Sequence, residues 1–255
     1  IGLVIGSFLN VCIYRIPRNI FWYSLFSRCC HCKALIPFWL NIPIISYCML
    51  RGRSKCCNKK ISLHYPLVEL ITAVSGVFLF WNYFIANYSW PPESLDNLSV
   101  IRFVHAFIFV CILIICSFID MRCKIIPDKI SLPMIAVSPV VALVHPELDL
   151  ISSLLGVVLG AGIIYAIAWT YYILRRQEGI GMGDAKLLAG IGGWLGYQSI
   201  LPSIFYASIL GTIAGIGVCI YKRSLSLKAE IPFGPFLAIG SLIFFLIPQN
   251  IHIFI

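Results

Sequence analysis

The sequence predicts an all-α polytopic membrane protein with about eight transmembrane helices and a small cysteine-bearing cytoplasmic domain after the first helix. Of its 255 residues, 60% are hydrophobic and only 11% are charged, whereas an ordinary soluble domain has roughly 25% charged residues. Apolar runs alternate with short polar connections, and the basic residues fall in every second connection. One connection, 15–66, is much longer than the others and is rich in cysteine.

The distribution of charge orients the chain. Of the 19 lysines and arginines, all but Arg102 fall in connections on one side of the bilayer, and the positive-inside rule makes that side the cytoplasm. The net charge of +9 therefore reports topology. Because the basic residues follow the alternation of the connections, as membrane topology requires, nucleic-acid binding is not expected.

The apolar runs predict the membrane spans in order, since roughly 20 residues cross the hydrocarbon core and shorter runs require tilt or burial in protein. The expected spans are 1–14, 67–87, 101–119, 132–145, 150–174, 187–197, 200–221 and 234–253. Both termini would then face outward. The chain accordingly divides into a first transmembrane helix at 1–14, a cytoplasmic domain at 15–66 and a seven-helix membrane domain at 67–255.

Two expected spans, 132–145 and 187–197, are short. The first contains Pro133 and Pro139, and the second is rich in glycine. One hypothesis is that both helices border a thin, water-filled recess, and the simpler one is that glycines allow close helix packing. A re-entrant segment at 187–197 is disfavoured, because it would reverse the next helix and move its basic end outside.

Two aspartates stand at the ends of apolar runs. Asp120 closes the run 103–119, and Asp184 follows Gly181 and Gly183 between two later runs. A carboxylate at the centre of a membrane helix costs roughly 2.5 to 3.5 kcal/mol, so ionisable residues near such segments indicate function. Two neighbouring carboxyls share a proton, and the pair can activate water while polarising a carbonyl. Side by side, Asp120 and Asp184 would hydrolyse a peptide bond.

Asp128 offers an alternative partner in the first aspartate loop. It follows Pro127 and precedes Lys129, which suits a loop turn or the N-cap of the next helix. We therefore expect Asp120 to be the catalytic member and Asp128 a supporting one. For each aspartate, a solvated loop carboxylate remains the alternative.

The segment around Asp184 contains further candidate site residues. Gly181 and Gly183 permit positive φ and close backbone approach, so we expect an extended substrate to lie against them. Lys186, two residues after Asp184, points elsewhere if the segment is already helical.

The cysteines of the cytoplasmic segment predict a metal site. Cys29 and Cys32 are followed by Cys56 and Cys57, close to the spacing of a four-thiolate zinc site. A domain of about 50 residues needs a cross-link such as a bound metal to be stable, and its cytoplasmic placement disfavours disulfides. The alternative is reduced thiols in a small folded lobe.

Several motifs in the same order give the chain a family resemblance. They are the segments 6–17, 65–70, 126–128, 181–186 and 232–235, together with Asp120 and the cysteine-bearing domain. With these motifs, the chain resembles the type IV prepilin peptidases, a family of aspartic proteases with a Gly-x-Gly-Asp loop.

The resemblance implies cleavage of the leader of type IV prepilins and type II secretion pseudopilins after a glycine. The reaction would take place at the cytoplasmic face of the bacterial inner membrane, with Asp120 and Asp184 as the catalytic dyad. It also implies methylation of the new N-terminus with S-adenosylmethionine, and Gly52 and Arg53 match the stretch associated with that activity. Prepilins, pseudopilins and membrane lipid are the expected partners.

The family pattern differs from this chain in the cysteine-bearing domain. It places the second cysteine pair at 54 and 57, but position 54 is Ser54. The site would then recruit Cys56, use His31 or be absent.

Glu69 either complements the dipole of the helix it begins or receives the basic leader or the new amino group.

Two other classes of function explain the sequence less well. A proton-coupled transporter would use the same carboxylates, but it predicts inverted repeats and polar residues at mid-membrane, and the spans here are apolar through their centres. A non-enzymatic secretion-machine scaffold has no evident use for the glycine-flanked aspartate.

Overall fold

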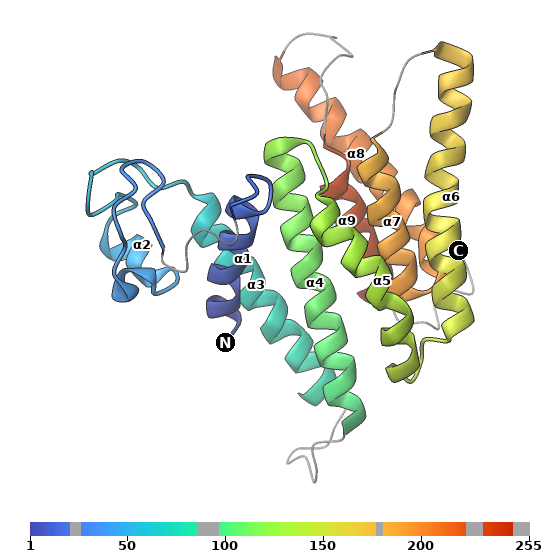
Figure 1. The fold of residues 1–255 in the computed structure, drawn as a ribbon, viewed down its shortest axis with the longest axis horizontal. Coiled ribbons are helices and arrows are strands. Elements are labelled where there is room, and N and C mark those ends of the chain that lie inside the picture. The colour runs from blue at the N-terminus through green and yellow to red at the C-terminus, as the bar shows by residue number, and fades with distance from the viewer. Residues whose placement is uncertain (21–26, 86–96, 177–180, 223–231, 247–255) are drawn as a thin grey trace. The chain divides into compact units, whose positions relative to one another are not determined.

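The computed structural model describes the chain except for residues 21–26, 86–96, 177–180, 223–231 and 247–255 (Figure 1). In the described part, the regular secondary structure is helical, apart from two isolated β-bridges, which pair Arg28 with Leu35 and Arg53 with Lys60. The chain divides into two compact units, Ile1–Ile115 and Cys116–Ile255. The helix α4 (Asn97–Cys123) contributes to both.

The first unit is built on two apolar helices, α1 (Gly2–Arg15) and α3 (His64–Phe80), which pack together. Gly6 allows their close approach, since a Cβ there would lie 2.7 Å from the Cα of Glu69. A π-helical turn, Trp81–Ile85, extends α3. The segment between α1 and α3 contains a 3₁₀ turn at Phe38–Asn41 and the short α2 (Ile45–Met49).

The second unit contains the end of α4 and five further helices. These are α5 (Asp128–Val144), α6 (Leu150–Arg175), α7 (Met182–Leu195), α8 (Ile200–Lys222) and α9 (Gly234–Leu246). A 3₁₀ turn, Tyr197–Ser199, precedes α8. The helix α7 packs on both α5 and α6 (Figure 1), and every residue from 187 to 194 is buried. It therefore forms the core of this unit.

Small residues bring α6 and α7 into backbone contact. Gly156 and Gly192 face each other so closely that a Cβ on either would overlap the backbone of the other. Beside them, the Ser153 hydroxyl donates a hydrogen bond of 2.7 Å to the carbonyl oxygen of Gly193. The glycines of the predicted span 187–197 thus serve close packing, the simpler of the two hypotheses.

Four helices of the described chain are long and apolar enough to cross a membrane. They are His64–Ile85, Asn97–Cys123, Leu150–Arg175 and Tyr197–Tyr221, and two shorter apolar helices are Gly2–Arg15 and Gly234–Leu246. This confirms an all-helical chain with several membrane spans. The full count of eight stays a prediction.

Two expected helices begin earlier than the hydrophobic runs indicated. The helix α5 begins at Asp128 and α7 at Met182, where the apolar runs suggested 132 and 187. The reason is local, because Pro127 and Gly181 precede the two helices in extended conformation, with φ of −68° and −69°. The first turns of both helices contain charged residues, so they do not belong to the apolar runs.

Candidate functional site

Asp120 lies in the last turns of α4 and is buried, with 5% of its surface exposed. Its Oδ2 atom accepts a hydrogen bond of 2.9 Å from the backbone N–H of Gly234, the first residue of α9. A buried carboxylate requires such a donor. The partner lies 114 residues along the chain, so sequence reasoning did not find it, although the motif 232–235 was part of the family resemblance.

Asp184 lies in the first turn of α7, before the apolar run that begins at residue 187. Burial and, to a smaller extent, the negative charge of Asp120 raise the pKa of its carboxyl to about 6. The charge of Asp120, near the end of α4, thus acts on Asp184 at the start of α7.

The glycines before Asp184 do not adopt the backbone that the sequence suggested. Gly181 has a φ of −69° and Gly183 lies within α7, so neither glycine uses the positive φ that it permits. The physical reason is that the helix begins at Met182. Close approach does occur at Gly183, but to the protein, since a Cβ there would lie 3.1 Å from the Cβ of Ile126.

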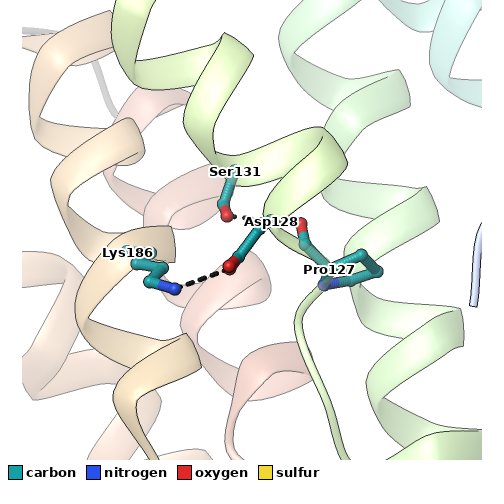
Figure 2. A network of polar contacts seen from close by, with 4 residues as sticks. All are labelled: Pro127, Asp128, Ser131 and Lys186. Atoms are coloured by element: carbon teal, nitrogen blue, oxygen red, sulfur yellow. Dashed lines mark hydrogen bonds and ion pairs between the residues drawn. The ribbon is translucent and has the colours of Figure 1, made fainter.

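Asp128 and Lys186 form an ion pair, in which Nζ lies 2.6 Å from Oδ1. Figure 2 shows the contact between the first turns of α5 and α7. Asp128 is the first residue of α5, and the predicted N-cap position belongs to Pro127. Its side chain is 58% exposed. Asp128 is thus an exposed, paired carboxylate, and Lys186 pairs with it instead of with Asp184.

Glu69 is buried in the second turn of α3. Its Oε2 atom accepts a hydrogen bond of 2.8 Å from the backbone N–H of Ile44, and the side chains of Ser7 and Asn10 also bond to it. Ile44 has a φ of 60°, which is strained for a β-branched residue. Glu69 therefore fastens the segment before α2 to α1 and α3.

The four predicted thiols lie together. The sulfur atoms of Cys29, Cys32, Cys56 and Cys57 are all within 4.8 Å of one another. The Cys32 and Cys56 sulfurs are 3.1 Å apart, and those of Cys29 and Cys57 are 3.8 Å apart. Since a tetrahedral zinc with bonds of about 2.3 Å places its sulfurs about 3.8 Å from one another, the cluster fits this metal.

Two similar turns carry the cysteines. In the first, the N–H of Cys29 donates to the carbonyl of Ala34 at 2.9 Å, and in the second the N–H of Ser54 donates to that of Lys59 at 2.8 Å. Each turn also has one left-handed residue, and these are Lys33 with φ 62° and Asn58 with φ 56°. Ser54 thus occupies in the second turn the place that Cys29 has in the first.

Cys56 supplies the fourth thiol of the cluster, because Ser54 carries a hydroxyl group in place of a thiol. The Ser54 hydroxyl oxygen lies 3.0 Å from the Cys56 sulfur and 3.4 Å from the Cys29 sulfur, so it touches the cluster without completing it. Burial raises the pKa of Cys29, but hydrogen bonds from the backbone of Cys32 and from Ser54 outweigh this and bring it to about 5. In the same cluster, the hydrogen bond with Cys56 raises the pKa of Cys32 to about 12, so the thiols share protons that a bound metal would replace.

A pocket of about 590 Å³ borders the second turn and is lined by Leu50, Arg51, Arg53, Ser54, Lys55 and Asn58. Its basic side chains suit a carboxylate. They do not suit the sulfonium and ammonium groups of S-adenosylmethionine, because none of the described residues that line the pocket is acidic. Gly52 has a φ of 68°, and a Cβ there would lie 2.8 Å from the Tyr47 hydroxyl. The pocket residues therefore fit only the carboxylate end of S-adenosylmethionine. The positive φ of Gly52 is sufficient reason for a glycine at that position.

Comparison with known proteins gives consistent matches in both halves. Residues 1–83 match the Bacterial Peptidase A24 N-terminal domain, and residues 107–216 match the Type IV leader peptidase family. The chain is 32% identical to the "Prepilin leader peptidase/N-methyltransferase" of Xanthomonas campestris pv. campestris, over 96% of this chain and 88% of that protein. For the proteins of the same name from Neisseria gonorrhoeae and Dichelobacter nodosus, the identities are 32% and 33%, covering 96% of this chain and 87% and 88% of theirs. No solved structure matches.

Proposed function

Because the chain belongs to the type IV leader peptidase family, we propose that Asp120 and Asp184 form the catalytic dyad of its peptidase. The function of the chain is that of a prepilin leader peptidase/N-methyltransferase, so prepilins are its substrates. The observation that supports the dyad is electrostatic. Burial is the main cause of the raised pKa of the Asp184 carboxyl, and the charge of Asp120 adds to it, as expected of two carboxyls that share one proton.

The pair would act by general acid–base catalysis. The ionised carboxylate takes a proton from a water molecule, which attacks the carbonyl carbon of the scissile bond. The protonated partner donates a hydrogen bond to the carbonyl oxygen and stabilises the charge that develops there. The first carboxyl then returns its proton to the leaving amine, and the C–N bond breaks. A pKa of about 6 at Asp184 keeps a proton available near neutral pH.

The geometry favours Asp120 over Asp128 as the partner of Asp184. Asp120 is buried, and its charge acts on Asp184. Asp128 is exposed and already compensated by Lys186. We therefore assign Asp128 and Lys186 a supporting role at the starts of α5 and α7.

We place cleavage after the leader glycine, at the cytoplasmic face of the bacterial inner membrane, and we include type II secretion pseudopilins among the substrates. The charge distribution supports this side of the membrane, since the connections that carry Asp120 and Asp184 belong to the basic set. Glu69 stays a candidate for binding the basic leader only if its contact with Ile44 opens.

We assign zinc to the four thiolates of Cys29, Cys32, Cys56 and Cys57. Bound there, the metal would cross-link the two turns and stabilise an extramembrane segment too small to fold on an apolar core alone. The name of the relatives implies that S-adenosylmethionine is the methyl donor. Gly52 and Arg53 stay predictions for its site, and Arg53 is the better candidate because it lines the pocket and can pair with a carboxylate.

The test is to incubate the purified protein with a prepilin and to follow the mass of the product. Loss of the leader alone shows the peptidase, and an added methyl group shows both activities. We expect Asp120→Asn and Asp184→Asn each to slow leader removal by roughly 10³-fold, and Asp128→Asn to retain it. Retained cleavage by either dyad variant would overturn the assignment. An unchanged substrate with the wild-type protein would instead favour a transporter or a scaffold.

A further inference from the structure

The contact between Asp120 and Gly234 is more specific than burial of a carboxylate requires. Within the part of the chain that the structure describes, the Gly234 N–H is the one hydrogen-bond donor to the Asp120 side chain, at 2.9 Å from Oδ2. Gly234 is itself buried. The bond is therefore shielded from water, which would otherwise compete for both groups.

The local fields explain why a donor is needed there. Asp120 lies near the C-terminal end of α4, where the free carbonyl groups of a helix disfavour a negative charge. Gly234 is the first residue of α9, and the first N–H groups of a helix have no partner within it and carry partial positive charge. The start of α9 thus offsets the unfavourable end of α4.

Only glycine at position 234 leaves the Asp120 carboxylate in its observed position. A Cβ on Gly234 would lie 2.7 Å from Oδ2 of Asp120 and 3.2 Å from its Cγ. The first distance is shorter than real Cβ contacts, so any larger residue must displace the carboxylate. The φ of Gly234 lies outside the left-handed region, so its backbone does not call for glycine. The neighbouring carboxylate does.

We propose that Gly234 is the positioning residue of the peptidase dyad, which orients the Asp120 carboxylate through its N–H and leaves room for it by lacking a side chain. The proposal rests on the proposed function of Asp120. With Oδ2 held by the backbone, Oδ1 is the oxygen left to take the proton from water. Since a general base must lie within hydrogen-bond reach of that proton, the orientation of this carboxylate limits the rate.

The test is single-turnover cleavage of a prepilin by Gly234→Ala, with enzyme in excess. Displacement of the carboxylate should lower the rate constant by about 10²-fold, since a misplacement of about 1 Å can cost that much. The enzyme concentration for half-maximal rate should not change, because Gly234 does not need to touch substrate. The amplitude reports the fraction of enzyme that is folded and active, and we expect it to stay near the wild-type value.

Gly217→Ala is the matched control, because a Cβ at that position of α8 would meet nothing within 4 Å. It should cleave like the wild type. Should Gly234→Ala fail to fold, replacing the amide between residues 233 and 234 with an ester removes the N–H without adding an atom. The rate constant of this variant should also fall.

Two results would overturn the proposal. One is a wild-type rate constant in a folded Gly234 variant, and the other is loss of amplitude alone, which would indicate a purely structural glycine. Asp120→Asn is measured in parallel. If Asp120→Asn cleaves normally, the dyad is wrong and the proposed role of Gly234 is wrong with it. If Asp120→Asn is slow while a folded Gly234→Ala keeps the wild-type rate constant, only the role of Gly234 is wrong.

Discussion

The cysteine cluster and the aspartate pair are assembled in opposite ways. Two short turns carry all four thiols, and each turn is closed by its own backbone hydrogen bond. The aspartates come from α4 and α7, and Asp120 also needs the start of α9. A site made of local turns can change one ligand without disturbing the rest. A site made of packed helices depends on every contact that sets the helices in place.

The largest expected effect would separate the two regions. Asp184→Asn should lower leader cleavage by roughly 10³-fold, because it removes one member of an acid–base pair. The same variant should still methylate a pilin that is supplied already cleaved, since the dyad takes no part in that step. Mass spectrometry of the two products measures both reactions. If methyl transfer fell with cleavage, the two activities would not be independent.

The second prediction tests the tolerance of the cysteine cluster. Cys56→Ser should lower zinc affinity by more than about 10²-fold, because even outer-shell changes cost 10- to 100-fold. The double variant Ser54→Cys/Cys56→Ser should restore the affinity, since Ser54 already contacts the Cys29 sulfur. Metal content and competition with a chelator give the measurement.

The control for this prediction is Cys48→Ser, which alters an exposed cysteine of α2 outside the cluster. It should bind zinc like the wild type. Unchanged zinc affinity in Cys56→Ser would show that three thiols and another ligand hold the metal.

The third prediction tests the intolerance of the helix packing. Gly192→Ala would place a Cβ on the backbone of Gly156, and we expect it to destabilise the protein by about 1 to 3 kcal/mol, as overpacking does. Gly162→Ala is the control on α6, because a Cβ there meets nothing within 4 Å. Thermal unfolding in detergent compares the two. Equal midpoints would contradict the close α6–α7 contact.

The smallest expected effect concerns the ion pair of Asp128 and Lys186. A double-mutant cycle with Asp128→Asn and Lys186→Met should give a coupling of about 0.2 to 1 kcal/mol, the usual range for exposed pairs. Urea or thermal unfolding provides the four stabilities. A coupling of several kcal/mol would contradict this weak role and show that the pair is a main anchor of α5 against α7.

The same contrast decides what the sequence could predict. The spacing of the cysteines predicted a cluster, because each pair lies within one short turn, but Ser54 left open whether Cys56 would complete it. The structure brings the sulfurs of Cys29, Cys32, Cys56 and Cys57 together. Apolar length predicted the helices, but not the starts of α5 and α7, whose first turns are polar. Gly181 and Gly183 permit positive φ, but α7 starts at Met182 and neither residue uses this freedom.

The long-range contacts had no local signal. Oδ2 of Asp120 and the N–H of Gly234 are separated by 114 residues, and Lys186 and Asp128 by 58. The charge of Asp120 and Asp184 indicated that they matter, but not which groups surround them. Such contacts follow from helix packing, which depends on many residues at once. For this reason the candidate residues could be predicted, while their partners could not.

The repeated turn at Cys29 and Ser54 bears on how such sites change during evolution. The second turn keeps its backbone with Ser54 at its first position, and Cys56 still brings its sulfur within 4.8 Å of the other three. The fourth thiol of such a cluster can therefore come from two residues further along the chain. A search for two Cys-x-x-Cys motifs would pass over this chain. The geometry of the turn, and not the spacing of its cysteines, is the character that would identify related metal sites in sequences that have diverged.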